Sequence, residues 1–184
     1  MFAFRTILRT LVVACCLALT LSAAARAQTS VKLAAFPDAS EEVYGIASGG
    51  KLYVFGGVGT AWTPKGLVYE YDPASDRWTK KKPMPLPSHH VALAESNGKI
   101  YVVGGEMRDT KMWGAFNVVE VFNPATNKWD SLTPLPVPRH GHAGDFVGNR
   151  LHVVSGDVQS LGGAKPDDVQ VETDLHHALE IPAR

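Results

Sequence analysis

The sequence predicts an all-β protein made of repeated units of about 50 residues, each folding into four short strands. The repeat is clearest in the stretch Tyr101-Val102-Val103-Gly104-Gly105, which has a near copy at residues 53–57 and a weaker copy at residues 152–156. Short segments of alternating apolar and polar residues are separated by Gly, Asn, Asp and Pro, which is typical of strands joined by turns. The regular period therefore favours a repeat architecture over a single irregular domain.

The first 27 residues are predicted to be a secretory signal peptide, which leaves residues 28–184 as the folded domain. Two arginines precede an apolar run at residues 11–21, and small residues lead to Ala25-Arg26-Ala27, which fits a cleavage site. Cleavage after Ala27 predicts a secreted or periplasmic protein. The alternatives are a lipoprotein signal at Cys15 and a membrane anchor. An apolar run of about 11 residues is too short to span a bilayer, so no membrane span is expected.

Both cysteines lie within the predicted signal peptide, so the mature chain contains none. Disulfides, thiolate metal sites and cysteine nucleophiles are therefore excluded from the mature chain. The mature chain keeps all 18 acidic residues and 15 of the 18 basic residues, which gives a net charge of −3. This balance provides no basic surface, so nucleic acid is not an expected partner.

Each unit is expected to contain four strands, which we name A to D in chain order. Strand B carries the repeated stretch, and strand D begins near a tryptophan, Trp78 or Trp129. Strand A is predicted at residues 43–48 and 91–95, and strand C at residues 68–71, 118–122 and 169–173. The expected bounds of the three units are residues 43–83, 90–134 and 141–184.

Turn-forming residues explain where these strands end. Asn97-Gly98 and Gly148-Asn149 tolerate the positive φ angles that two-residue hairpin turns require. Asp72-Pro73 and Asn123-Pro124 combine a side chain that hydrogen-bonds within its own turn with a fixed φ. The paired glycines end strand B where a close approach of backbone leaves no room for a Cβ.

The double glycine after an apolar strand, followed by a spaced tyrosine and tryptophan, resembles the kelch repeat. The residues that carry the resemblance are Gly56, Gly57, Tyr69, Trp78, Gly104, Gly105 and Trp129. The resemblance implies a kelch-type β-propeller of four-stranded blades, as in the central domain of galactose oxidase and in secreted bacterial kelch proteins. The third unit departs from the pattern, because it has His152 and Ser155 in place of tyrosine and glycine and no later tryptophan.

The mature chain has room for about three blades, whereas a propeller has about four to eight. Residues 31–37 match a strand D without the preceding strands A to C, and the third unit lacks a strand D. Three interpretations remain open. The chain is a shortened relative of a longer propeller, or two chains close head to tail into a ring through residues 31–37, or three blades stay open with exposed sheet edges.

One face of the predicted blades carries the long loops. In an up-and-down sheet the B–C and D–A loops leave on the same side, and binding residues concentrate on loops of a rigid scaffold. The B–C loops are expected at residues 58–66, 106–116 and 157–167, and the D–A loops at 87–89 and 137–140. The candidate ligand-binding residues are Trp62, His89, Arg108, Trp113, Arg139, His140 and His142.

The histidines admit two interpretations. His140 and His142 lie on one strand face, and His89 is the equivalent of His140, so the three imidazoles suit zinc, copper or iron. Alternatively, Arg139 and these histidines bind backbone carbonyls between blades. No carboxylate stands beside them at ligand spacing, so we predict no metal and no other cofactor.

The resemblance implies a secreted kelch-repeat binding module whose loop face takes a protein or a carbohydrate. The alternative is a sugar-processing enzyme, such as a periplasmic sialic acid mutarotase, whose ring opening needs an acid and a base. Arg139 with His140, or Glu106 with Arg108, would be the groups to supply them. The copper chemistry of galactose oxidase is excluded, because it requires a cysteine joined to a tyrosine.

Overall fold

The computed structural model describes residues 29–108, 113–159 and 170–181, and all of its strands fall within the compact unit Ala34–Arg184. Apart from a three-residue turn of 3₁₀-helix, η1 (Thr60–Trp62), the regular structure of these residues is β-strand. The all-β prediction is therefore confirmed. In the described part of the chain, no helix has the length and apolar character needed to cross a membrane.

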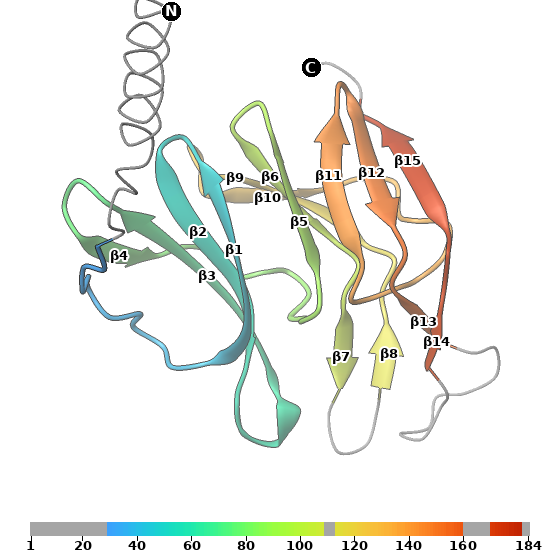
Figure 1. Cartoon of the computed structure of the whole chain (residues 1–184), viewed down its shortest axis with the longest axis horizontal. Coiled ribbons are helices and arrows are strands. Elements are labelled where there is room, and N and C mark those ends of the chain that lie inside the picture. Colours follow the sequence, from blue (N-terminus) through green and yellow to red (C-terminus); the bar gives the residue numbers. More distant parts are fainter. Residues whose placement is uncertain (1–28, 109–112, 160–169, 182–184) are drawn as a thin grey trace, which may run out of the picture. The chain divides into compact units, whose positions relative to one another are not determined.

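The strands form three successive antiparallel sheets (Figure 1). The first sheet has the order β1 (Glu41–Ser48), β2 (Lys51–Val58), β3 (Pro64–Asp72) and β4 (Arg77–Lys80). The second has the order β5 (Ala92–Ser96), β6 (Lys99–Val103), β9 (Val119–Asn123) and β10 (Lys128–Ser131). The third contains β11 (Ala143–Val147), β12 (Arg150–Val154) and β15 (His176–Glu180). The predicted strand order A to D is thus observed in the first two sheets.

Two small hairpins leave the B–C connections of the second and third sheets. One pairs β7 (Glu106–Arg108) with β8 (Trp113–Ala115), and the other pairs β13 (Asp157–Gln159) with β14 (Gln170–Glu172). The second hairpin corrects the sequence prediction, which placed strand C of the third unit at residues 169–173. Residues 170–172 pair with β13 instead, and β15 takes the place of strand C against β12.

The core lies between successive sheets, because β-branched and aromatic residues on facing sides of the strands pack together. Between the first and second sheets the fully buried residues include Phe55, Val68, Ile100 and Phe122. Between the second and third sheets they include Val103, Val119, Leu135, Leu151 and Val153.

The paired glycines are required because backbone of the D–A loops lies directly against them. A Cβ on Gly104 would lie 2.5 Å from the carbonyl oxygen of Arg139, and one on Gly105 would lie 2.8 Å from the carbonyl oxygen of His89. Both glycines also have positive φ, as Gly56 and Gly57 do in the first sheet. The predicted close backbone approach is therefore confirmed. The third copy keeps the same conformation with Ser155, whose φ is +62°.

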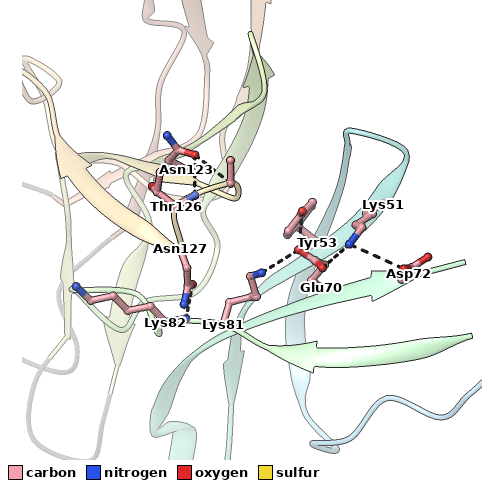
Figure 2. Close-up of polar contacts among 10 residues, drawn as sticks. Lys51, Tyr53, Glu70, Asp72, Lys81, Lys82, Asn123, Thr126 and Asn127 are labelled. Carbon is pink, nitrogen blue, oxygen red and sulfur yellow. Dashed lines mark hydrogen bonds and ion pairs between the residues drawn. The ribbon is translucent and has the colours of Figure 1, made fainter. Parts of the chain in front are cut away.

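A pair of hydrogen bonds repeats between neighbouring sheets and forms what we call the latch. The Trp129 indole donates to the Lys82 carbonyl oxygen at 3.1 Å, and Asn127 Oδ1 accepts from the Lys82 backbone N–H at 2.9 Å, the second contact appearing in Figure 2. In the first sheet, Trp78 donates to the Ala34 carbonyl at 3.1 Å, and Asp76 accepts from the Ala34 N–H at 2.9 Å. Ala34 therefore occupies the position that follows a strand D in a preceding sheet.

The third sheet ends at β15, with no fourth strand among the described residues. Leu179 of β15 lies opposite Leu151, as Phe122 of β9 lies opposite Ile100 in the second sheet. In the second sheet, Trp129 of β10 lies opposite Phe122 on its other side. In the part of the third sheet that the structure describes, no side chain takes this place of Trp129 beside Leu179. A hollow of about 880 Å³ opens here between the second and third sheets. Its apolar lining is Tyr101, Val121, Leu132, Phe146, Leu179 and Ile181.

Candidate functional site

Backbone hydrogen bonds hold the B–C and D–A loops together on one side of the sheets. His89 N–H donates to the Glu106 carbonyl at 3.0 Å, and Glu106 N–H donates back at 2.8 Å. His140 and Asp157 exchange the same pair of bonds at 3.1 and 2.9 Å. The hairpins β7–β8 and β13–β14 project beyond the main strands on this side, which we call the loop face (Figure 1).

Three imidazoles surround one buried carboxylate at the base of the loop face. Glu106 follows Gly105 directly and is 3% exposed. Its Oε1 lies 2.6 Å from His90 Nδ1, 3.7 Å from His89 Nδ1 and 3.6 Å from His140 Nδ1. These four residues, from two D–A loops and one B–C hairpin, make up the His–Glu cluster.

His90 adopts a backbone conformation that ordinarily favours glycine. Its φ is +52°, and the equivalent position of the third unit is Gly141, with φ +62°. A side chain in the left-handed region costs roughly 1–2 kcal/mol, and such strain gathers at functional sites. Two contacts hold His90 in place. Its backbone N–H donates to Tyr44 Oη at 2.9 Å, and its Nε2 lies 3.1 Å from Glu42 Oε2.

Charge is distributed unevenly over the cluster. The hydrogen bond to Glu106 raises the pKa of His90. Burial lowers the pKa values of His89 and His140. The arrangement therefore favours a charged imidazole at His90 and neutral imidazoles at the other two positions. Neutral imidazoles retain a lone pair that can accept a proton or bind a metal ion.

Arg139 and His142, two of the predicted ligand-binding residues, lie inside the protein rather than on the loop face. Arg139 is 0% exposed and donates to the backbone carbonyls of Ser155 and Leu175 at 3.4 and 3.2 Å. His142 is buried beside Gly104, where burial and the nearby Arg139 charge lower its pKa to about 4. Arg139 thus binds backbone carbonyls, but both adjoin strands of the third sheet, so these bonds do not link two blades as the alternative predicted.

The predicted aromatic and charged residues of the B–C loops fall on the loop face. Trp62 is 47% exposed at the end of η1, with its ring centre 6.3 Å from that of His89. Arg108 and Trp113 pair through their backbones in the β7–β8 hairpin, and their side chains lie outside the described part of the structure. The structure thus brings His89 and His140 together in the His–Glu cluster and places Trp62 beside it.

Sequence reasoning found the histidines but not the carboxylate that joins them. Glu106 was considered only with Arg108, and His90 was not among the predicted binding residues. Their pairing depends on the bridge between a D–A loop and a B–C hairpin, which local patterns do not reveal. The available signal was His90 at the position where the third unit carries Gly141. One donor atom from each of His89, His90 and Glu106 lies within 4.8 Å of the others, so these residues could hold a metal ion.

Comparison with known proteins gives a consistent set of relatives. The family model described as the kelch motif matches residues 46–85 and 87–136. A putative F-box/kelch-repeat protein of Arabidopsis thaliana is 36% identical over 48% of this chain and 28% of its own. The Kelch-like protein terF of Aspergillus terreus is 32% identical over 62% of this chain and 25% of its own.

Two further relatives each match about two thirds of this chain. Beta-scruin of Limulus polyphemus is 30% identical over 66% of this chain and 14% of its own. The solved structure of YjhT aligns with a TM-score of 0.58 and 29% identity, over 68% of this chain and 37% of that one. The chain therefore spans less than a third of the length of the three curated relatives and 37% of the YjhT chain.

Proposed function

Because the chain belongs to the kelch-repeat β-propeller family and forms part of such a propeller, we propose that it is a secreted protein-binding module that acts through its loop face. The observation that carries the proposal is the pair of backbone hydrogen bonds that fixes each D–A loop to its B–C hairpin. Loops held in this way present binding residues with little entropy left to lose.

The chemistry of the loop face suits a protein partner. Trp62 offers a large, half-exposed apolar ring beside polar imidazoles, and tryptophan is among the residues that dominate binding energy in protein interfaces. The mature chain carries a net charge of −3 by its sequence, which favours partners without strong acidic surfaces. Secretion through the N-terminal signal remains part of the proposal, and residues 1–28 lie outside the described structure.

The binding proposal is tested with a pair of surface variants. The mature chain is used to capture partner proteins from its own compartment. The affinity of a captured partner is then measured for the wild type, for Trp62→Ala and for Lys128→Glu. Lys128 is the matched control, since it is exposed next to the C–D turn on the opposite side of the second sheet. Trp62→Ala is expected to weaken binding tenfold or more, and Lys128→Glu to leave it unchanged. The reverse pattern would overturn the loop-face assignment.

A sugar-processing enzyme is the second candidate, and the His90–Glu106 pair is the observation that favours it. A charged imidazole 2.6 Å from a carboxylate supplies an acid and a base at the base of the loop face. Mutarotation of sialic acids and galactosides, followed by NMR with Glu106→Gln as the inactive control, separates the two functions. Turnover that disappears in Glu106→Gln establishes the enzyme, whereas no turnover on any sugar of the panel rejects it.

We also propose that a second copy of the chain completes the third blade, head to tail. The support is the repeat register. Ala34 occupies the place of Lys82 in the latch, which makes residues 29–32 equivalent to β4 (Arg77–Lys80). Residues 29–32 of the second copy would then pair with the free edge of β15, as β4 pairs with β3.

Residues 29–32 lack the large side chain that Trp78 supplies in β4, so the two copies of the chain are expected to associate reversibly. Ser30 takes the position of Trp78, so the second copy brings no large ring to the apolar hollow beside Leu179. Ser30→Trp is therefore expected to lower the dissociation constant of the pair at least tenfold. Sedimentation equilibrium measures it. Ser30→Ala is the matched control, and equal constants for all three proteins would contradict the proposed position of the strand.

A further inference from the structure

We propose that His89, His90 and Glu106 bind a divalent transition-metal ion, with zinc(II) as the ion that fits the ligand set. The three donor atoms are two imidazole Nδ1 atoms and one carboxylate oxygen. Two histidines with one carboxylate form a ligand set that catalytic and regulatory zinc sites use, with a fourth position left for water. The inference does not depend on the binding role of the loop face.

The spacing of the donor atoms matches such an ion. His90 Nδ1 and Glu106 Oε1 are 2.6 Å apart, the two Nδ1 atoms are 3.1 Å apart, and His89 Nδ1 is 3.7 Å from Glu106 Oε1. An ion with tetrahedral bonds of about 2.0–2.1 Å holds its ligand atoms about 3.3 Å apart. The observed distances bracket this value, so small side-chain adjustments suffice.

Protons alone satisfy this arrangement poorly. With one proton on His90 Nδ1, that proton has to be shared between Glu106 Oε1 at 2.6 Å and His89 Nδ1 at 3.1 Å, because neither acceptor carries a proton of its own in this arrangement. His89 Nδ1 in turn lies 3.7 Å from Glu106 Oε1, beyond hydrogen-bond distance. A cation among the three atoms interacts favourably with both imidazole lone pairs and with the carboxylate.

A second carboxylate orients His90 from behind, as is usual for metal-binding histidines. Its other ring nitrogen, Nε2, lies 3.1 Å from Glu42 Oε2, and Glu42 in turn accepts a hydrogen bond from Tyr44 Oη at 2.9 Å. Glu42 also has a left-handed backbone, with φ +54°. Glu42, His90 and Gly141 occupy the same position of the three units, so the fold imposes the left-handed conformation there, and it brings the Glu42 and His90 side chains together.

An ion can reach the cluster from solvent. The His90 side chain is one-third exposed and lines a hollow of about 460 Å³ together with Tyr44, Gly141 and His142. His89 and Glu106 lie behind it, almost completely buried, where few waters compete for the ion. The site therefore combines an accessible ligand with two buried ones.

The test uses the mature protein, purified without a histidine tag and stripped with a chelator. Zinc titration against a chromogenic chelator is expected to show one strong site per chain, and cobalt(II) to give the visible absorption of a tetrahedral ion. His90→Gly and Glu106→Gln are each expected to weaken zinc binding at least tenfold, and Glu42→Gln to weaken it about tenfold to a hundredfold. His90→Gly places at this position the residue that the third unit carries, so the fold is expected to tolerate it.

The control is His176→Ala. His176 and His152 form a second close imidazole pair, 2.9 Å apart, on the partly exposed β12–β15 ladder. This variant is expected to keep the affinity of the wild type. Zinc should also raise the melting temperature of the wild type and of His176→Ala, but not that of Glu106→Gln. Absence of zinc binding by the wild type, or loss of the site in His176→Ala with retention in His90→Gly, would overturn the proposal.

Discussion

At the scale of single residues, the pKa values of two glutamates of neighbouring sheets shift in opposite directions, although burial raises both. Burial opposes the charge of Glu70, yet hydrogen bonds from Lys51, Tyr53 and Lys81 lower its pKa to about 2 (Figure 2). Glu120 Oε2 has no hydrogen-bond partner among the described residues, and burial raises its pKa to about 7. The first carboxylate favours the folded state when charged, and the second when protonated.

Glu70 is therefore expected to cause acid sensitivity. Its pKa is lowered on folding, so its contribution is fully present above about pH 4.5 and is lost as the pH falls towards 2. A shift of this size corresponds to about 3 kcal/mol. Urea unfolding between pH 7 and pH 3 measures the effect. Glu70→Gln should be less stable at pH 7 and should lose less stability on acidification, whereas parallel pH profiles would contradict the assignment.

Glu120 is expected to act in the opposite direction. Its pKa is raised on folding, so the folded state is penalised as the pH rises from about 4.5 through 7. Glu120→Gln imitates the protonated form. It should increase the free energy of unfolding at about pH 8 by roughly 1–3 kcal/mol and change it little at about pH 5. A Glu120→Gln protein that is less stable at both pH values would show that Oε2 has a partner besides the Leu86 backbone N–H that the carboxylate accepts from.

At the scale of strands and turns, the sequence predicted the features that recur in each unit, but not which segments pair with one another. The double glycines were found because they recur at the same point of the first two units, where the D–A loops leave no room for a Cβ at Gly104 and Gly105. The choice of partner strand was not predictable for short segments such as residues 170–172, which join β13 rather than β12. For the same reason the His90–Glu106 contact escaped sequence reasoning, since it depends on which loops the repeat brings together.

Because the latch joins neighbouring sheets, a change at Trp129 is expected to lower the stability of the fold. Trp129 packs against Phe55 and Phe122, with ring centres 6.0 and 5.1 Å away, and its indole bonds to the Lys82 carbonyl. Trp129→Ala is expected to cost about 3 kcal/mol of unfolding free energy, mainly through lost packing. Trp129→Phe loses the same hydrogen bond but keeps most of the packing, so it should cost less. Chemical denaturation measures both, and equal costs would show that the packing of the ring contributes nothing beyond the indole hydrogen bond.

At the scale of the whole molecule, the chain holds two complete four-stranded blades and a third that ends at β15. The kelch repeats and the YjhT-like fold were predictable, because the repeat is written in the sequence as spaced glycines and tryptophans. The sequence did not predict which strand lies beside β15. The third repeat has no tryptophan to mark a strand D, and residue 30 is a serine where β4 has Trp78. The latch at Ala34 supports completion by a second copy.

The molar mass of the mature protein in solution tests this claim most directly. Light scattering coupled to gel filtration, across a series of protein concentrations, is expected to show a species of twice the chain mass that dissociates on dilution. The paired species should disappear when residues 29–32 are deleted, because these residues would form the fourth strand beside β15. A mass of one chain at every concentration would contradict the account.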